Sequence, residues 1–262
     1  MKAKWIIMLI IIIGVIAVGT NEQVQAYDND VLHWSFKPAK NHEPVTTEPE
    51  FIKLLDEAGG YFIGDTERKV LYLTFDNGYE NGYTEKVLDV LREKKVPATF
   101  FVTGHYLDSA PDLVKRMVNE GHIVGNHSWH HPSLPAVDGE RLSRELLKVK
   151  KRFAELTGIE YMNYLRPPRG EFSERSLELS EAEGYINVFW SLAYADWDVN
   201  KQKGADYAYN KIMDRIHPGA IMLLHSVSSD NAEALPRVID EAKKQGYTFE
   251  SLDDLTAQKM IP

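Results

Sequence analysis

Short apolar segments alternate with amphipathic helical patterns through most of this chain, and this alternation limits the folds open to it. Strands that are separated by helices run parallel in one sheet. The sequence therefore predicts an α/β fold in which seven such units form an incomplete (β/α)7-type barrel. The expected strands are 70–75, 98–102, 123–125, 164–166, 186–191, 221–224 and 247–252, and the expected helices are 84–94, 111–120, 139–157, 174–183, 206–216 and 231–245.

The first 26 residues have the pattern of an export signal. Lys2 and Lys4 precede the almost wholly apolar stretch 5–18, and residues 24–26 form a small-residue cleavage pattern. The apolar stretch is shorter than the roughly 20 residues that span a bilayer. We therefore expect a signal peptide over residues 1–26 and an exported, extracytoplasmic protein, rather than an uncleaved membrane anchor.

A polar segment with scattered aromatic residues and prolines follows the expected signal. Its one helical pattern covers residues 47–58 and stops at Gly59 and Gly60. The segment is too small to fold independently. We interpret residues 27–68 as an N-terminal extension that packs on the main domain, residues 69–257.

Composition and charge limit the partners of this protein and the residues that can stabilise it or bind a metal. The formal net charge is −9, and no block of Lys and Arg is interleaved with aromatic residues, so nucleic acid is not an expected partner. The chain has no cysteine. Core packing must therefore stabilise an exported domain, and any transition-metal site must use His, Asp, Glu or Asn. We expect a monomer.

Several predicted strands end in polar side chains that can carry out chemistry. Active sites of α/β barrels and open α/β sheets form where the carboxyl ends of parallel strands meet. Five such segments in one domain favour a hydrolase. They are Asp76-Asn77-Gly78, His127-Ser128-Trp129-His130-His131, Arg166-Pro167-Pro168-Arg169-Gly170, Asp196-Trp197 and Leu223-Leu224-His225.

The first two of these segments suggest a metal site. Asp76 and Asn77 can supply a proton acceptor and a metal ligand, although the same pair commonly makes only a turn or a helix cap. His127 and His131 are four residues apart, which directs both imidazoles at one point in a helix or tight turn and places His130 less well. Two imidazoles and an oxygen ligand suit zinc, and other divalent ions such as Co or Mn are alternatives.

The other segments can supply acid–base groups. Arg166, held by two following prolines, can keep the Asp76 carboxylate ionised, although a turn with exposed arginines is the simpler alternative. His225 ends an apolar strand, where it can be a general acid or a structural histidine. Asp196 can hydrogen-bond such a histidine and hold its tautomer.

Taken in this order, residues 69–255 resemble the polysaccharide deacetylase family, also called the NodB-homology domain or carbohydrate esterase family 4. The longer matches at residues 74–83 and 127–132 are similar to the delta-lactam-biosynthetic de-N-acetylases, which act on muramic acid during spore cortex formation. The resemblance implies an incomplete (β/α) barrel, in agreement with the strand pattern.

The resemblance also implies roles for the polar residues on one side of the expected site. Asp76 matches the catalytic base, and Arg166 matches the residue that orients it. His127 and His131 match the two histidine ligands of a divalent metal. Asn77 departs from the family pattern, because most members have a metal-binding aspartate there.

Further roles follow on the opposite side. Arg169 lies where the family supplies a backbone N–H to the oxyanion. Asp196 matches the carboxylate that tunes the general acid, His225. Trp197 and Leu223 match residues that wall the pocket for the acetyl group.

The implied reaction is metal-dependent hydrolysis of the N-acetyl group of N-acetylmuramic acid in a peptidoglycan glycan strand, a step toward muramic δ-lactam in the spore cortex. The Arg169 guanidinium could then pair with the lactyl carboxylate of the substrate, or only brace its loop. A deacetylase of N-acetylglucosamine in peptidoglycan or chitin-like glycans is an alternative. Another, motivated by Asn77, is a glycan-binding homologue that has lost catalysis.

Overall fold

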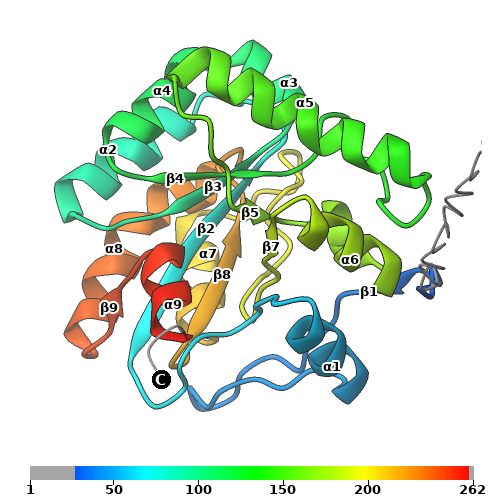
Figure 1. Ribbon diagram of the computed structural model, residues 1–262. Helices are drawn as coiled ribbons and strands as arrows, with labels where there is room; N and C mark the ends of the chain where they lie inside the picture. The colour runs from blue at the N-terminus through cyan, green and yellow to red at the C-terminus, as the bar shows by residue number, and fades with distance from the viewer. Residues whose placement is uncertain (1–26, 260–262) are drawn as a thin grey trace, which may run out of the picture.

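The computed structural model describes residues 27–259 (Figure 1), so the expected signal peptide lies outside the described residues. Within this range no helix is both long and apolar enough to cross a membrane.

A single, wholly parallel sheet forms the centre of the fold. Its strands follow the order β7-β5-β4-β3-β2-β8, and β9 pairs with the start of β2. This arrangement confirms the predicted α/β incomplete barrel. The strands are β2 (Val70–Asn77), β3 (Thr99–Val102), β4 (Ile123–Asn126), β5 (Tyr164–Leu165), β7 (Ile186–Asn187), β8 (Ala220–Leu224) and β9 (Thr248–Phe249).

The segment after β7 narrows the gap between the two ends of the sheet. The strand expected over 186–191 is paired in the sheet only at Ile186–Asn187. Further on, the Ser191 N–H donates to the Ile221 carbonyl at 3.0 Å, and Leu192 bridges Met222 of β8. The chain thus passes from β5 to β8. The polar residues that follow this segment, Asp196 and Trp197, therefore lie at the same end of the barrel as the other predicted site residues.

Helices cover the outside of the sheet (Figure 1). Six lie where the sequence predicts them: α2 (Thr84–Lys94), α4 (Pro111–Asn119), α5 (Gly139–Thr157), α6 (Glu174–Ala182), α7 (Ala205–Met213) and α8 (Ser229–Lys244). Two further helices, α3 (Gly104–Ser109) and α9 (Leu252–Lys259), were not predicted from the sequence. Both are too short to show a helical period clearly.

The strands are apolar because helices and opposing strands bury both of their faces. Every residue of β2 is buried, and so is every residue of β8. Strands of this kind read as continuous apolar runs rather than as alternating ones. Asp76 and Asn77 end β2 inside this apolar environment, where a carboxylate is costly unless it is paired.

The segment before β2 packs on the side of the barrel. Its strand β1 (Leu32–His33) pairs antiparallel with β6 (Glu171–Phe172), which follows the short 3₁₀ helix η1 (Pro168–Gly170). Its helix α1 (Pro49–Glu57) buries Phe51, whose ring lies 5.1 Å from that of Phe172. The Trp34 indole ring contacts the Phe189 ring with 4.7 Å between centroids. The domain boundary at residue 68 stays a prediction.

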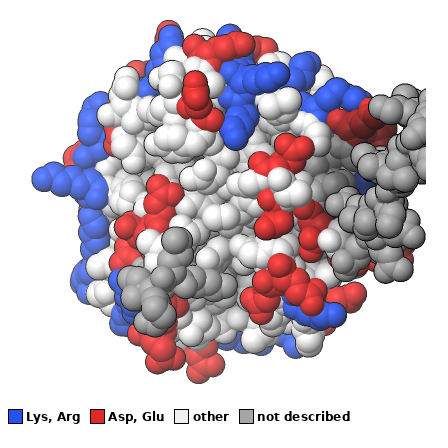
Figure 2. Space-filling view, viewed as in Figure 1, with Lys and Arg blue, Asp and Glu red and all other residues white. Residues whose placement is uncertain are grey.

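The face seen in Figure 2 has a largely uncharged middle with several groups of Asp and Glu, and its Lys and Arg lie mostly toward the edge. This face therefore offers no basic stripe of the kind that follows a nucleic-acid backbone.

Candidate active site

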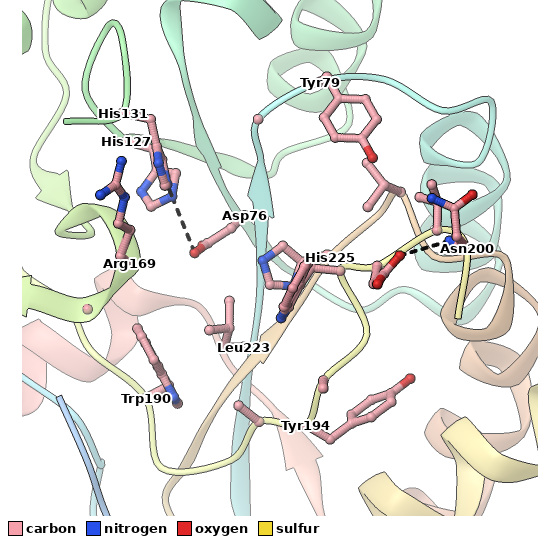
Figure 3. A pocket seen from close by; sticks show the side chains of 18 of the residues that line it. Asp76, Tyr79, His127, His131, Arg169, Trp190, Tyr194, Asn200, Leu223 and His225 are labelled. Atoms are coloured by element: carbon pink, nitrogen blue, oxygen red, sulfur yellow. Dashed lines mark hydrogen bonds and ion pairs between the residues drawn. The ribbon is translucent and has the colours of Figure 1, made fainter. Parts of the chain in front are cut away.

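The carboxyl end of the barrel opens into a cavity of about 850 Å³. Side chains from distant parts of the sequence meet there (Figure 3). Seven of the ten predicted site residues line it, namely Asp76, His127, His131, Arg169, Trp197, Leu223 and His225. Arg166 and Asp196 lie directly behind this lining and bond to two of its members, whereas Asn77 is directed elsewhere.

Arg166 holds the Asp76 carboxylate in place. Its Nη1 donates to Asp76 Oδ1 at 2.8 Å and to Thr74 Oγ1 at 2.7 Å, and its Nε donates to the Val188 carbonyl at 3.0 Å. Arg166 is fully buried and Asp76 nearly so. Burial raises the pKa of Asp76, but the charges of Arg166, His127 and His225 outweigh it and bring this pKa below its ordinary value. Asp76 is therefore an ionised acceptor at neutral pH.

His127 and His131 direct their Nε2 atoms at one point. The two nitrogens are 3.2 Å apart, and Asp76 Oδ2 lies 3.5 Å from His127 Nε2. The Arg166 carbonyl is 2.8 Å from His127 Nδ1, and since a carbonyl only accepts, Nδ1 carries the proton and Nε2 has a free lone pair. Burial lowers the pKa of both rings and, together with the neighbouring His127, brings the pKa of His131 to about 4.

A tight turn, not a helix, brings these two imidazoles together. Ser128 and His131 both adopt left-handed backbone conformations, with φ of 63° and 58°. The Asn126 side chain accepts from the Ser128 N–H at 2.8 Å, and the Ser128 hydroxyl accepts from the His131 N–H at 3.0 Å. These bonds stabilise a conformation that L-residues otherwise avoid.

The middle histidine of this turn has a different environment. His130 Nδ1 lies 2.8 Å from Glu145 Oε1, and its backbone N–H donates to Glu145 Oε2 at 2.7 Å. Glu145 projects from α5 and is almost completely buried. It thus fastens the turn from outside the cavity while its neighbour His131 points inward.

The imidazole pair fits a divalent ion. Two nitrogens about 2.0–2.1 Å from one tetrahedral zinc are about 3.3–3.4 Å apart, close to the 3.2 Å between the two Nε2 atoms. Two free lone pairs this close would repel each other without a proton or a cation between them. Within residues 27–259, however, no group of three or more His, Cys, Asp or Glu side chains is arranged to hold a metal. The pair would therefore hold an ion with few protein ligands.

Asn77, the expected third ligand, does not line the cavity. Its amide is fully buried, and its Nδ2 donates to Ser226 Oγ at 2.7 Å. Its Oδ1 is buried without a hydrogen-bond partner. A role of this oxygen in metal binding stays a prediction.

His225 belongs to a second hydrogen-bonded group. Its Nδ1 lies 2.7 Å from Asp196 Oδ1, and its backbone N–H donates to Asp196 Oδ2 at 2.8 Å. Burial lowers the pKa of His225, but the charge and hydrogen bond of Asp196 outweigh it, and this pKa is raised above its ordinary value. With Nδ1 held by Asp196, the Nε2 proton is free to act in the cavity.

Asn231, at the start of α8, fixes the Asp196 carboxylate. Its Nδ2 donates to Asp196 Oδ2 at 2.5 Å, and its Oδ1 accepts from the Tyr194 hydroxyl at 2.5 Å. Because the Asp196 carboxylate only accepts, the Asn231 amide nitrogen must face it, and the amide oxygen then faces the Tyr194 hydroxyl.

The remaining predicted residues form the walls. Leu223 is buried at the base, and Arg169 lies beside His131 (Figure 3). Arg169 has a left-handed backbone with φ of 61°. Trp197 is 60% exposed, so it contributes to the rim of the cavity rather than to an enclosed wall. Phe36, from the segment before β2, also lines the cavity.

Four positioning residues were not predicted from the sequence, and only one of them has a readable sequence signal. Thr74 precedes Asp76 by two residues, so strand alternation places both on one face of β2. Glu145, Tyr194 and Asn231 reach the site from helices and a loop. The sequence pattern does not specify how these elements are rotated against the sheet.

Comparisons with known proteins identify relatives of this chain. The family model for polysaccharide deacetylase matches residues 63–188. The peptidoglycan-N-acetylmuramic acid deacetylase PdaA of Bacillus subtilis is 49% identical over 246 residues, covering 94% of each chain. A peptidoglycan-N-acetylglucosamine deacetylase of Bacillus cereus is 32% identical over 198 residues, covering 74% of this chain and 70% of that protein. The structure of Bacillus subtilis PdaA, a family 4 carbohydrate esterase, aligns with a TM-score of 0.87 at 50% identity, covering 88% of this chain and 99% of that one.

Proposed function

Because this chain belongs to the polysaccharide deacetylase family of hydrolases, we propose that it removes the acetyl group from N-acetylmuramic acid in peptidoglycan. One observation carries the proposal. The carboxylate of Asp76, kept ionised by Arg166, opens on the same cavity as His225, whose pKa Asp196 raises. This is the base and acid pair that amide hydrolysis requires.

In the first half of the reaction Asp76 acts as general base. A water molecule attacks the acetamide carbonyl carbon, and Asp76 takes its proton. The low pKa of Asp76 keeps it ionised for this role. Arg166 keeps the carboxylate oriented and remains fully buried, so it does not itself contact the substrate.

In the second half His225 acts as general acid. The C–N bond breaks, and the imidazolium gives its proton to the departing sugar nitrogen, which is otherwise a poor leaving group. The products are acetate and a free amino sugar. The role of the Arg169 backbone N–H toward the oxyanion is part of the same proposal.

A divalent ion, which we propose to be zinc, would be held by His127 and His131, with Asn77 Oδ1 as a further candidate ligand. When bound, it would polarise the acetamide carbonyl and increase the acidity of water in the cavity. With two neutral imidazoles and no group of three or more His, Cys, Asp or Glu ligands in the described residues, we expect the ion to be weakly held.

The Asn77→Asp variant is expected to bind zinc about 10-fold or more tightly than the wild type, because a carboxylate adds a negative charge beside the cation. Competition with a fluorescent chelator measures this affinity. His131→Ala is the opposing control. Since outer-shell partners of a metal site already contribute about 10–100-fold, loss of a direct ligand should cost at least as much. Equal or weaker zinc binding by Asn77→Asp would show that the side chain at this position is not a metal ligand.

Substrate choice depends on Arg169. Once its peptide is removed, the lactyl ether of muramic acid ends in a carboxylate, which glucosamine lacks. Arg169 lines the cavity beside His131, and a guanidinium pairs with a carboxylate through two parallel hydrogen bonds. The similarity to PdaA, greater than that to the N-acetylglucosamine deacetylase, supports the same choice.

We expect Arg169→Gln to lower kcat/KM on peptide-free muramyl glycan about 10–100-fold, and to leave kcat/KM on chitin oligomers nearly unchanged. The charge-assisted pair that it removes is worth about 1.5–3 kcal/mol. Equal losses on both substrates would instead assign Arg169 to loop support alone.

Acetate release from defined glycan strands tests the proposed function directly. Wild-type protein loaded with zinc should release acetate from strands without peptide stems, and mass spectrometry should find the free amine on muramic acid. Free amine on glucosamine alone would favour the alternative substrate. Binding without acetate release would favour a non-catalytic homologue. An extracytoplasmic location and a role in spore cortex formation belong to this proposal.

A further inference from the structure

The segment before β2 reaches the catalytic cavity through two of its aromatic residues. Phe36 lines the cavity directly. Trp34 is buried behind the lining and hydrogen-bonds to two loops that form part of it. One loop, after β5, carries Arg169 and Gly170, and the other, after β7, carries Trp190. Arg169 and Trp190 lie on the same side of the cavity (Figure 3), so Trp34 supports that side from behind.

The loop that carries Arg169 depends on its surroundings for its backbone conformation. Arg169 and Gly170 are both left-handed, with φ of 61° and 67°. A residue other than glycine persists in this region only where the surrounding structure holds it there. The Trp34 N–H donates to the Gly170 carbonyl at 2.8 Å, and His33 of β1 pairs with Glu171 of β6. The segment before β2 therefore holds this turn from its carboxyl side.

Gly170 is also packed between two tryptophans. A Cβ built on it would lie 3.1 Å from the Cβ of Trp34 and 2.9 Å from Cη2 of Trp190. The loop therefore cannot shift at this point unless one of the tryptophans moves with it. The Trp34 Nε1 donates to the Trp190 carbonyl at 2.9 Å. Trp34 thus bonds to one loop through its backbone and to the other through its indole.

The Trp34 ring is itself held in place by an aromatic cluster. Its centroid lies 4.7, 5.3 and 5.9 Å from those of Phe189, Phe62 and Phe51. Phe51 belongs to α1, so the cluster joins this helix to the barrel. Because interiors packed in this way transmit strain, a change of the Trp34 side chain should displace both loops.

We propose that Trp34 is a positioning residue of the active site, which sets the place of Arg169 and Trp190 beside the cavity. The inference rests on the proposed function, in which the Arg169 backbone N–H serves the oxyanion and its guanidinium pairs with the lactyl carboxylate. A displacement of about 1 Å in such groups can cost about 10²-fold in rate. The segment before β2 therefore belongs to the active site and does not only support the barrel.

The experiment compares Trp34→Leu with Phe51→Leu, its matched control. Both variants remove a ring from the same cluster, and both should lower the urea midpoint. Phenylalanine has no side-chain donor, so only Trp34→Leu removes a hydrogen bond to the loops. Rates are measured where both variants are fully folded. We expect Trp34→Leu alone to lower the ratio of kcat/KM on peptide-free muramyl glycan to that on chitin oligomers, by about 10-fold.

Two further variants separate positioning from general support. Trp34→Phe keeps a ring in the cluster and removes only the indole donor, so it should fold stably and lower the same ratio about 3-fold, as the loss of one neutral hydrogen bond would. In the Arg169→Gln background the guanidinium is absent, and Trp34→Leu should then change the ratio little further. Additive effects of the two substitutions, or an equal fall of the ratio in Phe51→Leu, would overturn the proposal.

Hydrogen exchange tests the same inference without a substrate. The amides of Gly170 and Ser191 donate to the Pro167 and Ile221 carbonyls and report on the two loops. They should exchange about 10-fold faster in Trp34→Leu than in Phe51→Leu. Equal exchange in these variants would refute the role of Trp34, whichever sugar is deacetylated. Faster exchange in a protein whose wild type releases no acetate from muramyl glycan would instead refute the proposed function and support the role of Trp34 in placing the loops.

Discussion

Replacing Asp76 by asparagine is expected to lower kcat for acetate release about 10³-fold or more, with little change in KM. The amide keeps the shape of the side chain but cannot take a proton from water, and general-base catalysis contributes about 10²–10⁴-fold. The activity should be lost at every pH, because no protonation state of the amide restores a base. Initial rates of acetate release between pH 5 and 9 measure this.

The same substitution should destabilise the fold, because it leaves the fully buried Arg166 without its counter-charge. Breaking a buried ion pair from one side costs about 3–5 kcal/mol. Urea denaturation measures the loss. The double variant Asp76→Asn/Arg166→Met removes both charges and should recover part of the stability but none of the activity. A double variant that regains activity would show that Asp76 acts through folding and not as the base.

The effects on activity and on stability can be separated because the two oxygens of the Asp76 carboxylate have different neighbours. Arg166 contacts Asp76 through Oδ1, while Oδ2 is directed toward His127 and the cavity. Oδ1 thus serves the fold, and Oδ2 is free for the proton. Thr74 bridges Arg166 to the Met222 carbonyl of β8 at 2.6 Å, so the orientation of the base is tied to the sheet itself.

The strand ends were predictable from the sequence for a simple reason. A run such as 70–77 is apolar until it reaches Asp76, and parallel strands all bring their carboxyl ends to the same edge. The residues that face the reaction could therefore be placed together without knowledge of the helices. The incomplete barrel was likewise predictable, because strands separated by helices run parallel in one sheet.

The contacts and backbone conformations that orient these residues could not be predicted from the sequence pattern. The contact of His131 with His127 depends on two left-handed residues, a backbone choice that the spacing alone does not specify. The Asn77 side chain turns to Ser226, although the residue adjoins Asp76 in sequence. Glu145 and Asn231 lie on helices. The helical periodicity of the sequence indicates which face of each helix is buried, but not which loop that face contacts.

His225→Gln is expected to lower kcat about 10²–10⁴-fold, because the leaving nitrogen then receives no proton from the protein. The loss should be smaller on a substrate whose leaving group needs no protonation. An activated ester of acetate, such as the nitrophenyl ester, provides that comparison. A variant equally impaired on the amide and on the activated ester would assign His225 to binding rather than to proton transfer.

The pH dependence of kcat distinguishes the acid from a structural histidine. Asp196 raises the pKa of His225, so the imidazolium persists to higher pH than an ordinary histidine, and activity falls as pH rises through this raised pKa. Asp196→Asn removes the charge and lowers the pKa of His225. The alkaline limb of the profile should therefore move to lower pH, while Asp76 and Arg166, the other charged groups that act on this ring, are unchanged.

Asp230→Asn is the matched control for this shift. Asp230 is also a buried carboxylate near the start of α8, but it accepts from the backbone N–H groups of Lys203 and Gly204, whereas the hydrogen bonds of the His225 ring and backbone N–H go to Asp196. Its substitution removes the same charge and should leave the alkaline limb close to that of the wild type. If both variants move the limb equally, the shift reflects the net charge of the region. If only Asp196→Asn moves it, the hydrogen-bonded pair sets the protonation state of the acid.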